Sequence, residues 1–376
     1  MKALVVSYCV MKGFGGGVFA ARATVNAVAA VCDDVTLLFP ADRAGDRDPE
    51  VDPAVRQVGV TDPVSKPRKL LRTLRRGTLH RFEQAFHRLM EEERYDLVVF
   101  HNSKATRRLL PLAKARGAKV VTVHDNYEYE YTRDNFPWYH LWYLLPLTVK
   151  GEREAVLGSD LNLVLSAQDR ELLQKAYDPS HRSRIEVLGV FEYQDRPLPV
   201  LPERVREDVF AITGNLGVSQ TLDSLFPWLD TCWPMVQEIL PGSRLILAGK
   251  NPDPALKQRA ESLGAELVDT PRDMGCVLQR AKYYVCPVCK GGGVKLRVMD
   301  GLRYGLPVLV HQVSARGYDP FIGRSLFVYD APASFRAALA QMLETDVDRP
   351  SVQELYRASF SFPSGVARME KFLSSL

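Results

Sequence analysis

The sequence places a run of glycines directly before a cluster of charged residues, and this combination suits the binding of a nucleotide. Gly291-Gly292-Gly293-Val294 follows an expected strand at 283–286 and precedes an expected helix. Glycines allow the backbone to approach a ligand closely, and the first N–H groups of a helix attract anions such as a diphosphate. Lys295 and Arg297 add positive charge, and Asp300 can accept hydrogen bonds from a ribose. The spacing therefore indicates a site for a nucleoside diphosphate.

The same residues also fit a purely structural interpretation. A glycine loop before a helix is common, and Arg297 and Asp300, three positions apart, can pair on a solvated helix face. Lys295 and Arg297 are two positions apart, so they do not share one face of a regular helix. Lys295 would then act from the irregular start of the helix, while Arg297 points the same way as Asp300. On spacing alone both interpretations stay open.

Length and composition indicate an ordinary globular protein with two domains. The chain has 376 residues, more than a single core usually supports. An apolar fraction of 46% and a charged fraction of 25% are typical of globular proteins, and a net charge of +4 does not by itself indicate nucleic acid. No apolar run reaches the ~20 residues of a membrane helix. Met1-Lys2 leads straight into an apolar strand without a signal-peptide pattern, so we expect a cytoplasmic protein.

Six cysteines are scattered along the chain, which argues against a disulfide framework. Cys286 and Cys289 form a lone CxxC pair. A structural zinc site needs four ligands and no second pair lies at a suitable spacing, so no metal site is predicted. A redox role stays open, because the pair precedes a helix start, where thiolates are stabilised. Packing at a strand end is the interpretation that we favour.

Strands and helices alternate through the first half of the chain. The expected strands are continuous apolar runs, as in a parallel sheet with helices on both faces. A glycine loop covers 13–17, and a polar, proline-containing stretch (40–67) and a polar, aromatic loop (126–135) interrupt the pattern. The expected strands span 2–10, 35–39, 96–100, 118–123, 161–165 and 184–190, and the expected helices span 18–31, 79–93, 104–115, 141–157 and 168–176.

The pattern pauses in a proline-containing linker and then restarts. We predict an α/β fold of two Rossmann-like, doubly wound domains at 1–195 and 208–360, joined by a linker at 196–207. Because open α/β sheets bind ligands at the carboxyl ends of their strands, the two domains would face each other across a cleft. A C-terminal helix within 361–376 would return to the first domain. In the second half, the expected strands are 209–213, 244–247, 266–268 and 283–286, and the expected helices are 222–240, 255–263 and 364–376. The helix after the glycine loop is expected to end at Gly305, before another strand.

The second domain resembles the donor-binding half of GT-B glycosyltransferases, particularly glycosyltransferase family 4. Members often carry a proline, a glycine run, an Arg or Lys pair and an acidic residue before a Gly-x-Pro-Val segment. This chain is similar at Pro287, at glycines 291–293, at Lys295, Arg297 and Asp300, and at Gly305-Leu306-Pro307-Val308. Thr213-Gly214-Asn215-Leu216-Gly217 resembles the loop after the first donor-domain strand, and 247–252 resembles a Val-Gly-Arg-Asn-Pro segment.

The resemblance extends, more weakly, over the first domain. Gly13-Phe14-Gly15-Gly16-Gly17 is similar to the acceptor-side glycine loop, and His124-Asp125 resembles the histidine of the family's catalytic region. Residues 360–376 resemble the closing segment, in which a helix returns to the first domain. The resemblance therefore covers nearly the whole chain.

Two features depart from the family pattern. Many relatives carry two glutamates eight positions apart in the donor motif, whereas this chain has Gly292 at the first place and Asp300 at the second. An Arg/Lys pair after the first donor-domain strand is also absent, since 217–220 hold no cation; Lys295 and Arg297 would supply that charge. The missing glutamate bears on the recognition of donor-sugar hydroxyls, and leaves open an altered donor choice or inactivity.

The resemblance implies transfer of a sugar from a nucleoside-diphosphate sugar to a glycan or lipid-linked acceptor, with retention of configuration and without a cofactor or a metal. Cations and helix-end N–H groups aimed at the leaving diphosphate would stabilise the transition state more than the ground state. The expected catalytic residues are His124, Lys295 and Arg297. The expected substrate-binding residues are Gly15, Gly16, Gly17, Gly214, Asn215, Lys250, Gly291, Gly292, Gly293, Val294 and Asp300.

Side chains at strand ends of the first domain are further candidates. By resemblance His124 would contact the donor sugar, and the alternative is a satisfied turn or capping histidine. His101 also ends a strand, and there we favour the structural interpretation. Glu128 and Glu130 lie in the loop at 126–135. They could touch the acceptor, with a solvated loop as the alternative.

Two segments of the first domain suggest contact with a membrane. Residues 66–76 are strongly basic with interleaved leucines, and residues 136–145 are aromatic and apolar. Basic amphipathic stretches bind anionic lipid surfaces, and Trp and Tyr favour the interface. A polyprenyl-diphosphate-linked acceptor at the inner face of the membrane would suit both segments, as in polysaccharide biosynthesis. A solvated basic face and a buried helix are the alternatives. Nucleic acid is not expected, because the basic run lacks a binding module.

Three other functions remain as competing hypotheses. A non-catalytic relative would bind a nucleotide or a partner without transfer, and a sugar-nucleotide epimerase would share the two-domain shape. A dinucleotide-dependent oxidoreductase fits least well, because 13–18 lacks the last glycine of the fingerprint, although Asp42 lies near the end of the second strand.

Overall fold

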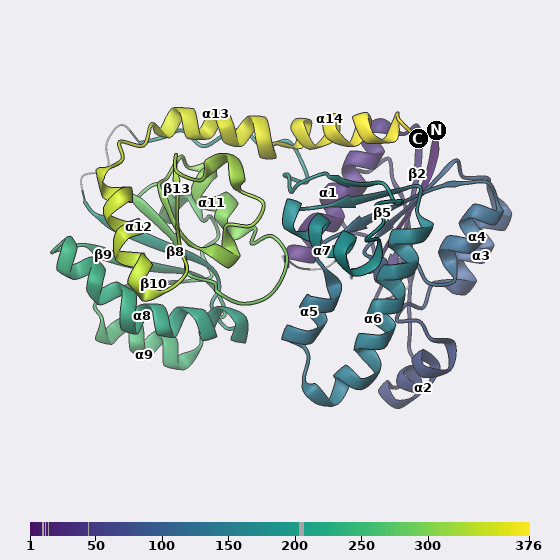
Figure 1. The fold of residues 1–376 in the computed structure, drawn as a ribbon, viewed down its shortest axis with the longest axis horizontal. Coiled ribbons are helices and arrows are strands. Elements are labelled where there is room, and N and C mark those ends of the chain that lie inside the picture. Colours follow the sequence, from purple (N-terminus) through teal and green to yellow (C-terminus); the bar gives the residue numbers. More distant parts are fainter. Residues whose placement is uncertain (10, 12, 14, 44, 203–206) are drawn as a thin grey trace. The chain divides into compact units, whose positions relative to one another are not determined.

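The computed structural model describes every residue of the chain except 10, 12, 14, 44 and 203–206. Four predictions fall partly outside the described residues: Val10 at the end of the first strand, Phe14 in the glycine loop, Ala44 in the polar stretch at 40–67, and 203–206 in the linker. The chain divides into two compact units (Figure 1). The first holds Met1–Arg196 and Phe360–Leu376, and the second holds Pro197–Ser359.

The first unit is built on a sheet of seven strands, all paired in parallel. These strands are β1 (Lys2–Ser7), β2 (Asp34–Pro40), β3 (Arg56–Val60), β4 (Leu97–His101), β5 (Lys119–His124), β6 (Leu161–Val164) and β7 (Ile185–Val187). Their order across the sheet is β3-β2-β1-β4-β5-β6-β7. The direction of winding therefore reverses between β1 and β4, as in doubly wound sheets.

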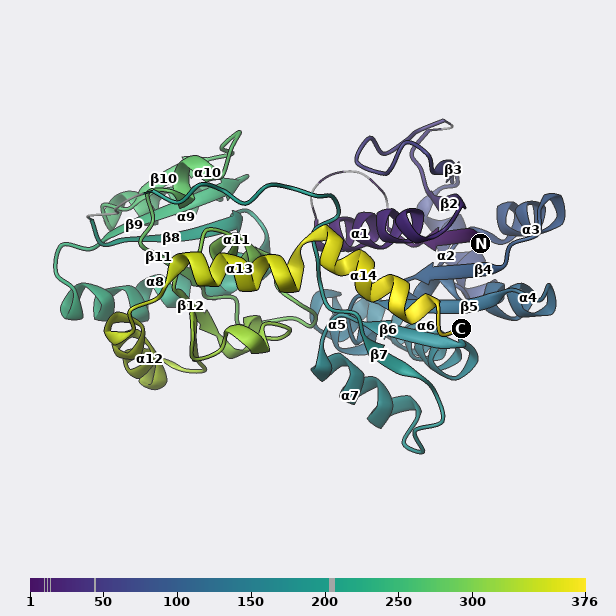
Figure 2. The same cartoon turned by 90° about the horizontal axis from the view of Figure 1, so that it is seen from above.

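Helices cover both faces of this sheet. They are α1 (Gly16–Val31), α2 (Lys66–Arg76), α3 (Glu83–Glu92), α4 (Leu109–Ala115), α5 (Glu128–Asn135), α6 (Trp138–Gly158), α7 (Ala167–Tyr177) and α14 (Phe362–Leu373), with a short 3-10 turn η1 (Ser103–Ala105). On one face, Val25 of α1 and Met369 of α14 share a buried core with Val5 of β1. Figure 2 shows α14 lying beside α1. On the other face, α3 and α4 pack against Phe100 of β4.

The second unit repeats this architecture with six parallel strands. These are β8 (Val209–Asn215), β9 (Arg244–Lys250), β10 (Glu266–Asp269), β11 (Tyr283–Cys286), β12 (Val308–His311) and β13 (Leu326–Tyr329). The order is β10-β9-β8-β11-β12-β13, so the winding reverses between β8 and β11. The prediction of an α/β fold with two doubly wound domains is confirmed.

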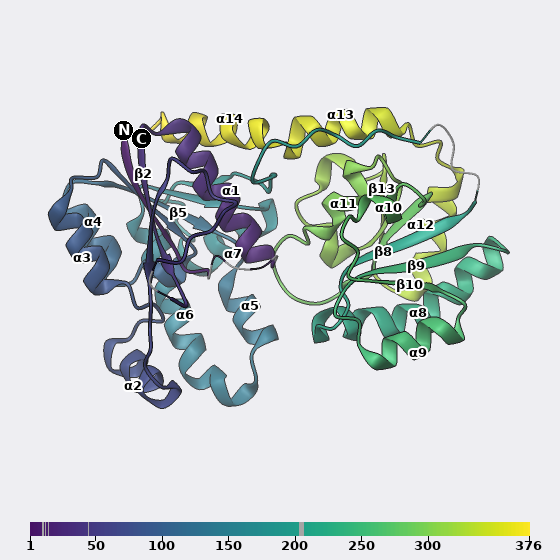
Figure 3. The same cartoon turned by 180° about the vertical axis from the view of Figure 1, so that it is seen from behind.

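The helices of the second unit also lie on two faces (Figure 3). They are α8 (Ser219–Ile239), α9 (Pro254–Ser262), α10 (Gly275–Leu278), α11 (Arg297–Arg303), α12 (Pro332–Glu344) and α13 (Arg349–Phe360), with 3-10 turns η2 (Gln312–Ser314) and η3 (Asp319–Phe321). Trp228 of α8 and Phe335 of α12 pack in one core with Phe210 of β8. Helix α11 packs closely against the ring of Tyr284. A Cβ atom built on Gly301 of this helix would lie 2.7 Å from that ring.

The structure corrects several sequence predictions. The predicted loop at 126–135 contains α5, whose first N–H groups, on Glu128 and Tyr129, donate to the carboxylate of Glu152. That carboxylate lies more than twenty residues away, so no local pattern reveals this helix start. The polar stretch at 40–67 contains β3, and the predicted helix at 104–115 breaks at Arg108, where φ is +66°. Helix α1 begins at Gly16, so the glycine loop is shorter than predicted.

Candidate functional site

The glycine loop of the second unit connects β11 to α11 and is closed by a lysine side chain. Gly291 and Gly293 have φ values of +79° and +71°, in the left-handed region that favours glycine. Lys295 donates from Nζ to the carbonyl oxygens of Gly291 at 2.8 Å and of Gly292 at 2.7 Å. Because Lys295 donates hydrogen bonds to carbonyl groups of the loop, its side chain stabilises the loop conformation. The spacing of the sequence did not indicate this role.

Arg297, the first residue of α11, reaches the carboxyl end of β8. Its Nη2 donates to the hydroxyl of Thr221 at 3.1 Å, and its Nη1 lies 3.5 Å from the carbonyl oxygen of Thr213. A Cβ atom built on Gly214 would lie 2.8 Å from the guanidinium carbon. The absence of a side chain at Gly214 therefore leaves the space that the guanidinium occupies.

Asp300 lies on the same helix and is linked to the same strand. It accepts a hydrogen bond from the hydroxyl of Thr213 at 3.1 Å, and that hydroxyl lies 2.7 Å from the phenol oxygen of Tyr284. Burial, together with the charge of Asp300, raises the pKa of Tyr284 well above its usual value, so the phenol stays protonated. Sequence reasoning missed Thr213 and Tyr284 as partners of Asp300. Contact between Asp300 and a ribose stays a prediction.

The other predicted residues of the second domain lie at two adjacent strand ends. Gly214 pairs with Gly249, and Asn215 pairs with Lys250, in the parallel register of β8 and β9. A Cβ built on Gly249 would lie 1.7 Å from the carbonyl oxygen of Gly214, so only glycine fits there. The predicted residues thus gather at the carboxyl ends of β8, β9 and β11, where the winding reverses and open α/β sheets bind ligands.

The glycines predicted for the acceptor side form the start of α1. Gly15 is the N-cap residue, and Gly16 and Gly17 lie in the first turn. Within the described residues no side chain caps this helix, and its first turn carries no acidic residue. A helix start of this kind favours an anion. The role of these glycines in substrate binding stays a prediction.

His124 ends β5, but its side chain is fully buried. Its Nε2 lies 3.0 Å from Oδ1 of Asn162 on the neighbouring strand β6. Burial lowers the pKa of His124, although the hydrogen bond with Asn162 opposes that effect. The imidazole is therefore neutral at neutral pH. This contact fits the structural alternative for His124, and its contact with a donor sugar stays a prediction.

Glu128 belongs to a buried group of charged side chains, so the solvated-loop alternative is wrong for it. Its carboxylate pairs with Lys104 and accepts a hydrogen bond from Nδ2 of Asn102 at 2.6 Å. Its backbone N–H donates to Oε1 of Glu152 at 2.6 Å. Burial and the charge of Glu128 raise the pKa of Glu152 to about 8. Sequence reasoning missed this group because its members come from three separate segments, at 102–104, at 128 and at 152.

His101, the last residue of β4, is also fully buried. Its Nε2 lies 2.9 Å from Oδ1 of Asp125, the residue that follows β5. Burial alone would lower the pKa of His101, but the charge of Asp125 and the neighbouring thiol of Cys9 raise it to about 10. His101 is thus a paired side chain, as the structural interpretation expects.

The segment that was predicted to contact a membrane is exposed where it is most aromatic. Trp138 is 83% exposed and Trp142 is 63% exposed, so the buried-helix alternative is wrong for the start of α6. No residue of α2 is buried, and Leu71 is 65% exposed. Helix α2 and the turn between α5 and α6 lie at the same end of the first unit, the lower end in Figure 1 and Figure 3. None of the described helices is long and apolar enough to span a bilayer.

Two family models match the chain. The model for Glycosyltransferase Family 4 matches residues 14–189, and the model for Glycosyl transferases group 1 matches residues 208–345. Together they cover most of the chain and fall on the two units. No curated protein matches it.

Several solved structures share the fold over the full chain. The apo form of the lipopolysaccharide outer core galactosyltransferase WaaB is 12% identical, with a TM-score of 0.69 and coverage of 100% of both chains. Sucrose-phosphate synthase from Thermosynechococcus elongatus is 14% identical, with a TM-score of 0.72 and coverage of 100% of this chain and 99% of that one. HepE of Anabaena in complex with UDP is 13% identical, with a TM-score of 0.66 and full coverage of both chains.

Proposed function

The chain belongs to the group 1 glycosyltransferases with the GT-B fold, and we propose that it moves a sugar from a nucleoside-diphosphate sugar to a glycan or lipid-linked acceptor. We further propose that the transfer retains the configuration of the sugar and needs no metal. The observation that carries the proposal is the position of Arg297. Its guanidinium lies beside Gly214 at the carboxyl end of β8, and β8 pairs with β11, the strand that the glycine loop follows.

This position suits the chemistry of the leaving group. Negative charge grows on the diphosphate as the glycosidic bond breaks, and a fixed cation stabilises that charge most in the transition state. The hydrogen bond to Thr221 holds the guanidinium of Arg297 in place before the substrate arrives. The loop closed by Lys295 brings backbone groups to the same strand ends. In this proposal Arg297 contacts the phosphates, and Lys295 positions the loop.

If the sugar keeps its configuration, the acceptor hydroxyl attacks from the same face of the sugar from which the diphosphate departs. The leaving phosphate can then accept the proton of that hydroxyl as the new bond forms. His124 of the first unit is neutral, because burial lowers its pKa. It would contact the donor sugar and help to orient it. Uridine diphosphate is the first nucleotide to test, because the structurally similar HepE was solved in complex with UDP.

A lipid-linked acceptor is supported by the exposed surface of the first unit. Among the described residues, Lys66, Arg68 and Arg75 of α2 make no recorded ion pair, so their charges are open to anionic headgroups. The start of α6, which carries the exposed Trp138 and Trp142, lies at the same end of the unit (Figure 1). Indole rings favour the membrane interface. We propose that this surface brings the active site to an acceptor at the inner face of the membrane.

Calorimetric titration of UDP, GDP, dTDP and ADP into the full chain tests the donor site. We expect one nucleotide to bind, and we expect Arg297→Ala and Lys295→Ala to weaken that binding by about tenfold or more. Lys290→Ala is the matched control, because Lys290 lies beside the same loop but pairs with Asp223 at 3.3 Å. Equal affinity in the wild type and both site variants would overturn the assignment.

A further inference from the structure

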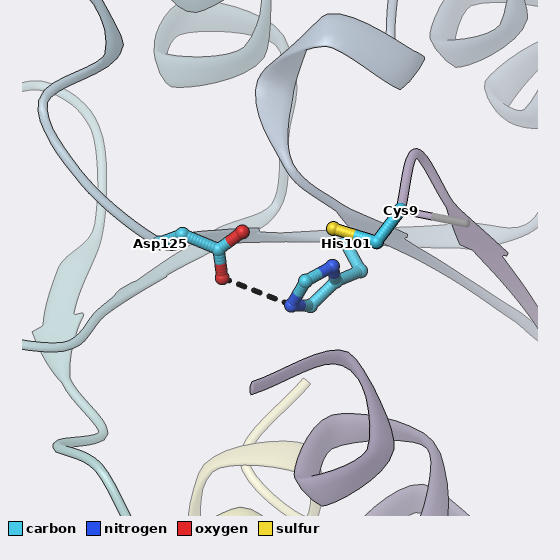
Figure 4. Close-up of side chains that lie close together, drawn as sticks. All are labelled: Cys9, His101 and Asp125. Carbon is cyan, nitrogen blue, oxygen red and sulfur yellow. Dashed lines mark ion pairs between the residues drawn. The ribbon is translucent and has the colours of Figure 1, made fainter. Parts of the chain in front are cut away.

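Three potential metal ligands meet at the carboxyl ends of β1, β4 and β5 in the first unit (Figure 4). Cys9 follows β1 by two residues, His101 ends β4, and Asp125 follows β5. These strands are neighbours in the sheet, so their ends bring the three side chains together. Sγ of Cys9, an imidazole nitrogen and a carboxylate oxygen all lie within 4.8 Å of one another. The predicted acceptor-side Gly17 adjoins this group, since a Cβ built on it would lie 3.2 Å from Sγ of Cys9, but glycine supplies no side-chain ligand.

The buried members of the group lack directed hydrogen bonds. His101 is fully buried and Asp125 is 7% exposed. Although Nε2 of His101 lies 2.9 Å from Oδ1 of Asp125, neither imidazole nitrogen nor this oxygen makes a hydrogen bond of acceptable geometry within the described residues. The ion pair with Asp125 offsets part of the cost of burying His101, and a bound ion would supply a partner for the atoms that make no hydrogen bond.

We propose that Cys9, His101 and Asp125 form a binding site for a thiophilic divalent cation such as Zn²⁺. Thiolate, imidazole and carboxylate are the ligands that zinc uses, and three protein ligands leave a fourth position for water. Zinc bonds of about 2.0–2.3 Å place ligand atoms about 3–4 Å apart. Nε2 of His101 and Oδ1 of Asp125 are already close to that spacing at 2.9 Å, so only Sγ of Cys9 needs a small closing movement. Cys9 can make that movement, because it is half-buried and lies outside the strand.

Neighbouring groups support the ligands. Nδ2 of Asn102 lies 3.5 Å from Oδ2 of Asp125, the oxygen that does not face His101. The hydroxyl of Ser7 accepts a hydrogen bond from the backbone N–H of Cys9 at 3.2 Å, which orients the segment after β1. Second contacts of this kind are typical of metal ligands. A bound ion would tie the segment between β1 and α1 to the ends of β4 and β5.

The CxxC pair does not compete for this assignment. Cys286 is buried in β11, and the backbone N–H of Cys289 donates to the hydroxyl of Ser224 at 3.2 Å. In the part of the chain that the structure describes, neither residue joins a group of three potential ligands. Packing at the strand end, as favoured from the sequence, fits both.

Zinc and cobalt binding to the untagged, chelator-treated full chain tests the site. We expect one Zn²⁺ per chain by calorimetry, and with Co²⁺ a thiolate charge-transfer band in the near ultraviolet. We expect Cys9→Ser to abolish that band and to weaken zinc binding by about tenfold or more. Cys276→Ser and Cys289→Ser are matched controls that should bind as the wild type does, since Cys276 is exposed and lies in the second unit.

Two outcomes would overturn the proposal. One is a wild-type chain that binds no zinc, and the other is a Cys9→Ser variant that binds Zn²⁺ as tightly as the wild type. His101→Gln provides a second test, and its circular dichroism spectrum shows whether the variant is folded. Folded His101→Gln with unchanged zinc affinity would also exclude the site. None of these measurements depends on sugar transfer. Their results therefore test the zinc site independently of the proposed function.

Discussion

The guanidinium group of Arg297 occupies the space that any side chain at Gly214 would need. A Cβ atom built on Gly214 would lie 2.8 Å from both the guanidinium carbon and Nη1. The φ value of Gly214 is +144°, a backbone conformation that other residues rarely adopt. The glycine at the end of β8 and the arginine at the start of α11 therefore depend on each other.

This dependence predicts that Gly214→Ala acts through Arg297. The flexible guanidinium gives way to the new methyl group, so we expect nucleotide binding to weaken by about tenfold, or about 1.4 kcal/mol. In the Arg297→Ala background the same change should weaken binding less than it does in the wild type, because only the backbone strain at Gly214 remains. Calorimetry on the double variant measures the difference. Gly242→Ala is the matched control, because Gly242 also has a positive φ of +85° but no neighbour within 4 Å. Independent, additive losses would contradict the coupling.

The glycine loop between β11 and α11 could be predicted because its determinants are local in the sequence. Three glycines, the apolar strand before them and the helical spacing after them lie within about twenty residues. The same holds for most strands, whose continuous apolar runs mark a sheet with both faces covered. What was missed depends on distant contacts. Helix α5 starts where Glu152 accepts its first N–H groups, and Lys295 turned out to bond to its own loop.

The group formed by Cys9, His101 and Asp125 in the first unit was harder to predict for the same reason. His101 and Asp125 come from different strands, and nothing in the spacing of 24 residues shows that they meet at 2.9 Å. The parallel order of β1, β4 and β5 places them together, and that order is a property of the whole sheet. The sequence indicated where each strand ends, but it did not indicate which strands are neighbours in the sheet.

We predict that His124→Ala lowers kcat by about tenfold or more while nucleotide affinity changes less than twofold. His124 belongs to the first unit, whereas the loop that we predict to bind the diphosphate belongs to the second unit. In our proposal His124 contacts only the sugar. Asn162→Ala is the control, since it removes the partner of His124 but no predicted sugar contact. Steady-state kinetics and calorimetry separate the two effects. If both variants lose stability equally and keep kcat, His124 is a structural residue.

The stability of the first unit should depend on pH through Glu152. A glutamate in the unfolded chain loses its proton near pH 4.5, whereas burial and the charge of Glu128 raise the pKa of Glu152 to about 8 in the fold. Between these values the folded state binds more protons, so this group lowers the free energy of unfolding as pH rises. The slope is at most about 1.4 kcal/mol per pH unit.

Urea unfolding at pH 5.5, 7.0 and 8.5 measures this effect against a matched variant. Glu152→Gln should flatten the dependence, because its side chain carries no titrating proton. Glu154→Gln should leave it unchanged, since Glu154 lies on the same helix but is 46% exposed and pairs with Arg107. A wild type and a Glu152→Gln variant with the same pH slope would show that Glu152 does not titrate in this window.

Helix α14 should contribute to the stability of the first unit although it is the last element of the chain. Met369 is fully buried in the core that α1 and β1 share. Met369→Ala should lower the free energy of unfolding by about 2–5 kcal/mol, because it removes buried methylene groups and leaves a cavity. Lys371→Ala, on the exposed side of the same helix, should change it by less than about 0.5 kcal/mol. Equal effects of the two changes, measured by urea unfolding, would contradict this packing.

The exposed tryptophans at the start of α6 should control binding to anionic membranes. Their indole rings can enter the interface while the cations of α2 contact the headgroups, so both features should add to the affinity. Cosedimentation with vesicles of phosphatidylglycerol and of phosphatidylcholine measures the effect. We expect binding to the anionic vesicles alone, weakened about tenfold or more in Trp138→Ala/Trp142→Ala and reduced by salt. Leu157→Ala is the control, because Leu157 is 50% exposed at the opposite end of α6. Equal binding of the double variant and the wild type would mean that this surface does not contact lipid.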